Sequence, residues 1–340
     1  MEMHISGVNI HYELAGSGAK RVVLLHGWGC STELMKPVAD ALSADMTVLS
    51  VDFPAHGKST KPPEPWGVPE FAACLKGLLT KLNFLPCSVI AHSFGGRVTI
   101  ELASADEKLF DRIILTGAAG IRKQADGKAS KKTTTYKKLK SLVEMSRKLH
   151  IFGDLPDKWQ EALIQKYGSK DYAALSPEMR KTFVKVVNYD QSDKLAKIKN
   201  STLLVWGDKD TETPLWMGQQ MEKEIADSAL IVLNGGTHFA YLEQAARFNA
   251  IARSFLVETN CFCQRIGEEP HEYPGGVVAR AGRGRIVPGG QPKPDALFPA
   301  GELSVCRLFP HAEAQLPACD DARRDHDCVL AAAAFDPPQH

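Results

Sequence analysis

Short runs of apolar, mostly β-branched residues recur through the first 257 residues of the chain and alternate with longer amphipathic stretches. The runs predict buried strands at 21–26, 46–52, 88–92, 111–117, 201–207 and 229–234. The stretches between them predict helices, most clearly at 68–83, 94–105 and 214–226. Two N-terminal segments, about 2–7 and 8–14, predict an antiparallel hairpin at a sheet edge. Strands alternating with helices predict an α/β fold, a mostly parallel sheet with helices on both faces.

The interval 121–200 interrupts this alternation, because it contains helical patterns and no buried strand run. The patterns cover 133–150, 156–167, 169–175 and 177–188. A helical insertion between two strands of a parallel sheet is well placed to form a cap. Residues 121–148 carry ten Lys or Arg against Asp126 and Glu144. A solvated helical face accounts for this charge, and attraction of anionic substrates or surfaces is the alternative.

The composition changes near residue 258. Residues 1–257 contain 25 Lys and 8 Arg, whereas residues 258–340 contain 1 Lys, 7 Arg and 10 of the 20 prolines. The last segment shows no helical or strand period, so we expect a disordered or loosely attached C-terminal tail. A fused or mis-joined reading frame would also produce this change. We therefore predict a core from 1–120 and 201–257, a helical cap from 121–200, and a low-order tail from 258–340.

A metal site in the tail is the alternative interpretation of its cysteines and histidines. The candidate ligands are Cys261, Cys263, Cys306, His311, Cys319, His326 and Cys328. The tail contains no CxxC pair and the gaps between these residues are irregular, which disfavours such a site. We expect no metal and no cofactor.

Composition and charge narrow the class of protein. The hydrophobic share of 44% and the charged share of 24% are ordinary for a soluble globular protein. The formal net charge of +1 gives no general attraction to nucleic acid or anionic membranes. The first residues lack a signal-peptide pattern, and no apolar window approaches 18 residues. We therefore expect a cytoplasmic protein that binds a small-molecule substrate, with no nucleic-acid or membrane partner; its oligomeric state stays open.

The stretch "VIAHSFGGRV" (89–98) places Ser93 between a predicted buried strand and a helix that begins at once. Ala91 and Gly95 flank it at two residues on either side, where strand and helix backbones approach closely. The pattern G-x-S-x-G, here with Ala91 at the first glycine, is typical of a nucleophile raised on a strained turn. An ordinary strand–turn–helix is the alternative.

A serine nucleophile needs a base, and a base of this kind needs an acid to orient it. In "NGGTHFAYLE" (234–243), His238 follows a predicted strand and two glycines. In "LLVWGDKDTETP", Asp208 and Asp210 follow another strand end. Ser93, Asp210 and His238 thus each lie just beyond the C-terminal end of a predicted strand and form a candidate triad.

Backbone N–H groups for an oxyanion hole are predicted in "LLHGWGCST" (24–32), where Gly27 and Gly29 permit a tight loop. The candidate donors are the N–H of Trp28 and the N–H of Phe94, directly after Ser93. One such donor contributes about 3–4 kcal/mol to lowering a barrier in other enzymes.

Residues 1–257 resemble an α/β-hydrolase with a helical cap. The resemblance rests on "HGWG", "DFPAHGKS" (52–59), "AHSFGG" and "GDKD…GGTH", which occur in the expected order. It implies catalytic roles for Ser93, Asp210 and His238, and family spacing favours Asp210 over Asp208 as the acid. His26, His56 and His92 are expected to be structural, and Asp52 to anchor its loop.

A serine at this turn argues against the dehalogenase and epoxide hydrolase branches, which resemble this fold but use aspartate there. The favoured function is a carboxylic ester hydrolase that works through an acyl-enzyme. A carbon–carbon bond hydrolase of the meta-cleavage-product type is the runner-up. Its members usually carry tryptophan after the catalytic histidine and an "HGGGPG" loop, whereas this chain has Phe239 and "HGWGCS". A catalytically silent ligand-binding protein on the same fold is the third possibility.

Overall fold

The computed structural model describes residues 1–122, 131–148, 155–167, 170–257 and 279–280. In this part of the chain, nine strands form one sheet in the order β1-β2-β4-β3-β5-β6-β7-β8-β9. The strands are β1 Glu2–Ile5, β2 Val8–Ala15, β3 Lys20–Leu25, β4 Met46–Val51, β5 Cys87–His92, β6 Phe110–Thr116, β7 Ser201–Gly207, β8 Ser228–Leu233 and β9 Ala279–Arg280. Strands β3 to β8 pair with one another in parallel, and β1 and β2 form an antiparallel hairpin at one lateral edge of the sheet. The predicted α/β fold is confirmed.

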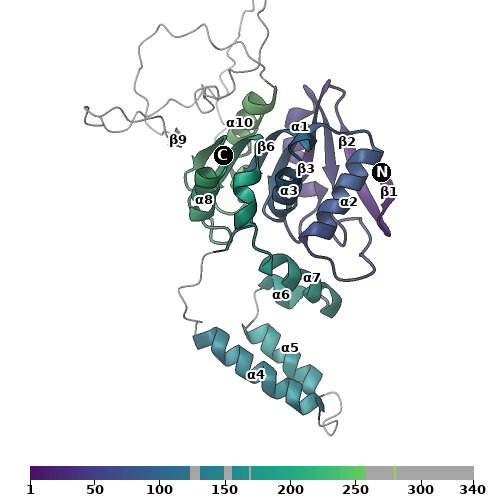
Figure 1. The fold of residues 1–340 in the computed structure, drawn as a ribbon, viewed down its shortest axis with the longest axis vertical. Helices are drawn as coiled ribbons and strands as arrows, with labels where there is room; N and C mark the ends of the chain where they lie inside the picture. Colours follow the sequence, from purple (N-terminus) through teal and green to yellow (C-terminus); the bar gives the residue numbers. More distant parts are fainter. Residues whose placement is uncertain (123–130, 149–154, 168–169, 258–278, 281–340) are drawn as a thin grey trace, which may run out of the picture.

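Helices cover both faces of the sheet (Figure 1). The helices of the α/β part are α1 Thr32–Leu42, α2 Val68–Lys81, α3 Phe94–Ala105, α8 Trp216–Glu224, α9 Ala240–Glu243 and α10 Ala245–Val257. Side chains from α1 and α10 share a core with one face, and side chains from α2, α3 and α8 share a core with the other.

The central strands explain why both faces are covered. Successive side chains of a strand point to opposite faces. In β3, Val23 and Leu25 belong to the core under α2 and α3, whereas Val22 and Leu24 belong to the core under α1 and α10. A strand buried on both faces is therefore apolar throughout, which is the pattern the sequence shows.

Four helices lie between β6 and β7, within the interval predicted to form a cap. They are α4 Lys131–Lys148, α5 Leu155–Tyr167, α6 Lys170–Ala174 and α7 Pro177–Asn188. Figure 1 shows α4 and α5 side by side beyond α6 and α7, away from the sheet. Arg180 of α7 donates two hydrogen bonds to Glu161 of α5, at 2.6 and 2.8 Å, and so links the two helices. The division of the chain into a core, a cap and a tail stays a prediction.

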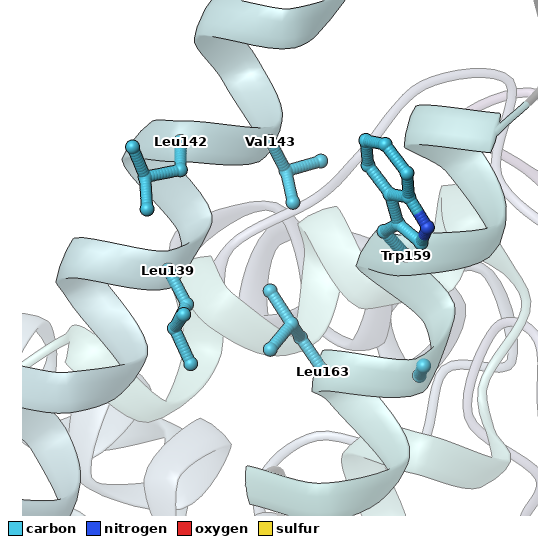
Figure 2. Close-up of a pocket in the computed structure, with 6 residues that line it drawn as sticks. Leu139, Leu142, Val143, Trp159 and Leu163 are labelled. Atoms are coloured by element: carbon cyan, nitrogen blue, oxygen red, sulfur yellow. The ribbon is translucent and has the colours of Figure 1, made fainter. Parts of the chain in front are cut away.

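An apolar cavity of about 340 Å³ lies between α4 and α5. Figure 2 shows Leu139, Leu142 and Val143 of α4 on one side and Trp159 and Leu163 of α5 on the other. Among the described residues, its lining comes from these two helices and not from the loops that carry Ser93 and His238.

The tail lies outside the described residues, with one exception. Residues 279–280 form β9 and pair antiparallel with β8, whereas the sequence predicted no strand there. Pairing of this kind uses backbone groups at an open sheet edge, which no side-chain pattern reveals. The candidate tail ligands Cys261, Cys263, Cys306, His311, Cys319, His326 and Cys328 also lie outside the described residues. Within the described ranges, no three His, Cys, Asp or Glu side chains are grouped as metal ligands, and no helix is long and apolar enough to span a bilayer.

Candidate active site

Ser93 lies on the turn between β5 and α3, with φ 50° and ψ −106°. A non-glycine residue in this sparsely populated region stores of the order of 1–3 kcal/mol of strain. Two glycines allow the turn: a Cβ on Gly95 would lie 2.7 Å from the Leu25 carbonyl oxygen, and a Cβ on Gly96 would lie 2.4 Å from Cβ of Ala118. The partly exposed Ser93 is therefore held on a sharp turn between strand and helix.

Asp210 accepts hydrogen bonds at both carboxylate oxygens. Oδ1 accepts from the backbone N–H groups of Glu212 and Thr213, each at 2.9 Å. Oδ2 lies 2.8 Å from the Thr213 hydroxyl and 2.9 Å from His238 Nδ1. Burial opposes ionisation of Asp210, but the hydrogen bonds from His238 and Thr213 outweigh it and hold the pKa of this carboxyl below its usual value.

The contact with Asp210 sets the tautomer of His238. An ionised carboxylate only accepts hydrogen bonds, so Nδ1 of the neutral imidazole carries the proton and Nε2 keeps its lone pair. The His238 side chain is 14% exposed, while that of Asp210 is fully covered. The carboxylate therefore orients the ring through Nδ1, while part of the His238 side chain stays exposed.

The competing carboxylate, Asp208, points elsewhere. It is exposed, and its Oδ1 accepts the Gly235 N–H at 2.6 Å, which ties its loop to the loop before His238. The structure thus brings Asp210, and not Asp208, to the imidazole.

Ser93 directly follows β5 and His238 lies in the loop after β8, so both lie at the carboxyl ends of the parallel strands. Among the described contacts, no hydrogen bond joins their side chains; the Nδ1 of His238 contacts Asp210 instead. The His92 and His238 ring centroids are 4.7 Å apart, so the base sits beside the residue that precedes Ser93. Hydrogen bonds of this kind are often long without substrate and tighten when it binds.

The loop that carries Trp28 is held by His26. Nδ1 of His26 donates to the Gly27 carbonyl at 2.7 Å, and Nε2 accepts the Phe53 N–H at 3.0 Å. Burial lowers the pKa of His26 to about 3, which keeps the ring neutral and able to make both contacts. A Cβ on Gly27 would lie 3.2 Å from Cβ of Ser93. The backbone before Trp28 therefore approaches the serine closely.

The candidate oxyanion donors are the backbone N–H of Phe94, the residue directly after Ser93, and that of Trp28, directly after Gly27. Neither has an acceptor among the described residues, and Phe94 belongs to the first turn of α3, whose N–H groups lack intrahelical partners. The Trp28 ring packs against Phe94 and against Phe183 of α7, each with centroids 5.3 Å apart. Trp28 thus joins the Ser93 turn to the inserted helices.

His92 is fully buried and donates from Nε2 to the backbone carbonyl of His238 at 2.9 Å. Burial, with a further contribution from His238, lowers the pKa of His92 to about 3. His56 is buried and contacts the Pro54 carbonyl through Nδ1 at 2.9 Å. Both rings therefore contact backbone carbonyls, and their structural role stays a prediction.

Asp52 accepts three contacts that join separate segments. Its oxygens accept from the Thr32 N–H at 2.7 Å, the Lys58 N–H at 2.9 Å and His11 Nδ1 at 3.0 Å. Asp52 therefore anchors the start of α1 and the loop that follows β4, away from the imidazole of His238.

Comparison with known proteins shows the family of the chain. Residues 22–251 match the model of the alpha/beta hydrolase family. The chain belongs to that family. It is 26% identical to the pimeloyl-[acyl-carrier protein] methyl ester esterase of Neisseria meningitidis, over 70% of this chain and 93% of the relative. It is also 26% identical to the 2-hydroxy-6-oxo-6-phenylhexa-2,4-dienoate hydrolase of Comamonas testosteroni, over 75% of this chain and 93% of the relative.

A solved structure has the same fold. The esterase of Exiguobacterium antarcticum superposes with a TM-score of 0.59 at 25% identity, over 75% of this chain and 99% of that one. Two of these proteins are named as esterases and one as a dienoate hydrolase, so they agree with a hydrolase family without naming the substrate of this chain.

Proposed function

We propose that the protein is a serine hydrolase that cleaves a small-molecule carboxylic ester through an acyl-enzyme. The observation that carries the proposal is the 2.9 Å contact between Asp210 Oδ2 and His238 Nδ1, at the sheet edge where Ser93 stands on a strained turn. Ser93 is the nucleophile, His238 the general base and Asp210 the acid that orients it.

Each step assigns one task to these residues. Nε2 of His238 takes the proton of the Ser93 hydroxyl as its oxygen attacks the ester carbonyl carbon. The N–H groups of Trp28 and Phe94 donate to the oxyanion that forms. The intermediate collapses when the carbon–oxygen bond to the alcohol breaks and His238 protonates the leaving alcohol. Water, deprotonated by His238, then attacks the acyl carbon; the bond from that carbon to Ser93 Oγ breaks, His238 returns the proton to Oγ, and the carboxylic acid leaves.

Two sequence features favour an ester over a carbon–carbon bond. Phe239 follows His238, and the oxyanion loop reads "HGWGCS". The methyl ester esterase among the relatives agrees with this choice. Cleavage of a carbon–carbon bond beside a ketone is the second candidate, supported by the dienoate hydrolase among the relatives.

The test combines labelling with turnover. A fluorophosphonate should label Ser93, and p-nitrophenyl esters of graded acyl length should be hydrolysed faster than a 2-hydroxy-6-oxo-dienoate. Replacing Ser93→Ala should lower kcat by about three orders of magnitude or more while the melting temperature and substrate affinity stay close to wild type.

Ser88→Ala, at the other end of β5 and buried, is the matched control, and this variant should keep its turnover and still be labelled at Ser93. Turnover of Ser93→Ala within tenfold of wild type would reject Ser93 as the nucleophile. Faster turnover of the dienoate than of every ester would replace the ester proposal by the second candidate. A wild-type chain that is neither labelled nor active would indicate a silent binding protein.

A further inference from the structure

The turn after β6 is bonded to the backbone of Ser93 on both sides. The Ser93 N–H donates to the Thr116 carbonyl at 3.2 Å, and the Ala119 N–H donates to the Ser93 carbonyl at 3.0 Å. Residues 116–119, which we term the β6 turn, therefore fix the position of the candidate nucleophile.

The same turn lies against the acid and the base. Gly117 has φ 50°, and a Cβ there would lie 3.2 Å from Asp210 Oδ2 and 3.3 Å from His238 Nδ1. A side chain at this position would displace both groups. The β6 turn thus passes between the backbone of Ser93 and the Asp210–His238 pair.

One side chain bridges this turn and that pair. The Thr213 hydroxyl oxygen lies 2.8 Å from the Gly117 carbonyl oxygen, 2.8 Å from Asp210 Oδ2 and 3.2 Å from His238 Nδ1. A hydroxyl has one proton to donate and two lone pairs that accept. It can donate to the carbonyl or to the carboxylate, and it offers Nδ1–H of His238 a second acceptor beside Asp210.

The backbone at Thr213 is held independently of this hydroxyl. Its N–H donates to Asp210 Oδ1 at 2.9 Å, and its carbonyl accepts from Nε1 of Trp206 at 2.7 Å. Thr213 is 5% exposed. Substitution of the side chain therefore leaves the loop anchored and isolates the hydroxyl.

We propose that Thr213 is a positioning residue whose hydroxyl ties the Asp210–His238 pair to the turn that holds Ser93. The inference rests on the proposed function, because it assigns Thr213 to the geometry of that triad. Without the hydroxyl, the acid–base pair is free to shift relative to the nucleophile, and small displacements of reacting groups lower turnover more than binding.

The test compares three variants of the full chain. Thr213→Val keeps the shape and removes the hydroxyl, whereas Thr213→Ser keeps the hydroxyl. Thr202→Val is the matched control, since Thr202 is fully buried at the opposite end of β7 and its hydroxyl donates to the Asn200 carbonyl at 2.9 Å. We measure kcat, KM and melting temperature with the best p-nitrophenyl ester.

We expect Thr213→Val to lower kcat about tenfold or more, as for loss of a hydrogen bond to a charged group, with KM within twofold. Thr213→Ser should recover kcat to within threefold, and Thr202→Val should lose melting temperature but not kcat. Unchanged kcat in Thr213→Val, or equal losses in Thr213→Val and Thr213→Ser, would overturn the inference. If Thr213→Val does not fold, the ratio of kcat between Thr213→Ala and Thr213→Ser tests the inference in the same way.

A readout without turnover separates this inference from the proposed function. NMR follows exchange of the His238 Nδ1 proton with solvent, which should be at least tenfold faster in Thr213→Val than in wild type and in Thr213→Ser. A wild-type chain that hydrolyses no ester and no dienoate defeats the proposed function, and the exchange rates still decide the role of Thr213. Equal exchange rates in all three proteins would overturn it.

Discussion

Gly27 lies directly against the ring of His92, so that a Cβ at position 27 would come within 2.8 Å of His92 Nδ1. The other nitrogen of the same ring, Nε2, donates to the His238 carbonyl at 2.9 Å. One buried imidazole therefore separates the loop of the candidate oxyanion hole from the loop of the candidate base.

This contact predicts the effect of Gly27→Ala. The added methyl group would meet His92 and Ser93 at distances that real Cβ atoms rarely show, so the ring or the loop must shift. A displacement of about 1 Å at an active site lowers turnover about a hundredfold, and we expect a loss of that size in kcat. Gly7→Ala is the control: Gly7 has φ 80° and only Pro63 nearby, so it should lower the melting temperature and keep kcat. Turnover of Gly27→Ala within fivefold of wild type would contradict this.

The buried histidines predict an acid-sensitive fold. Burial lowers the pKa of His92 and of His26 from 6.5 to about 3. Between these values the unfolded chain binds more protons than the native one, so stability is full above pH 6.5 and is lost as the pH falls toward 3. Each ring contributes a slope of up to about 1.4 kcal/mol per pH unit.

His92→Gln tests this dependence, because the glutamine amide can still donate to the His238 carbonyl but does not titrate. Urea unfolding at pH 7 and pH 5 should show a smaller loss of unfolding free energy in His92→Gln than in wild type. The exposed His4→Gln serves as the control for removal of a histidine from the surface. Equal losses in wild type and His92→Gln would contradict the assignment.

Most of the fold could be predicted from the sequence, because strands buried on both faces are continuous apolar runs. No end of the six central strands lies more than one residue from its predicted position. The sequence pattern does not predict helix α1. Pro37 lies inside it, and a proline in a helix interior removes a hydrogen bond and disfavours the assignment. Strand β9 could not be predicted, since it depends on backbone pairing with β8 alone.

The candidate triad was also predictable, because Ser93, Asp210 and His238 each follow a strand of one parallel sheet, and the carboxyl ends of such strands meet at one edge. Thr213 was missed. Its neighbours in "DTETP" show no periodicity, and its partner at Gly117 is 96 residues away in the chain. The two residues meet because the loop after β7 packs against the β6 turn. The hydroxyl three residues after the acid was the one available signal.

Removal of residues 258–340 should leave the fold and its turnover close to those of the full chain. The family match ends at residue 251, and α10 already packs Phe248, Ile251 and Phe255 against the sheet. In the described part of the tail, two residues of β9 pair with β8. The melting temperature and ester turnover of a chain ending at Val257 check this. Failure to fold, or zinc bound stoichiometrically by the full chain, would contradict it.

Asp208 and Asp210, both after β7, carry the same carboxylate but contact different partners. Their variants therefore give the sharpest prediction. Asp210→Asn places an amide beside His238: if Nδ2 faces the ring, it donates to Nδ1, and the imidazole proton moves to Nε2, where it blocks removal of the Ser93 proton. The equivalent change in a serine protease lowers turnover about ten-thousandfold, and we expect at least a hundredfold here, with little change in KM.

Asp208→Asn keeps an oxygen that accepts the Gly235 N–H, so it should keep its turnover and lose about 1 kcal/mol of stability. Measurement of kcat and melting temperature for both variants decides between them. If Asp208→Asn loses turnover and Asp210→Asn keeps it, the carboxylate that serves His238 during the reaction is Asp208, and the loop after β7 must rearrange when substrate binds.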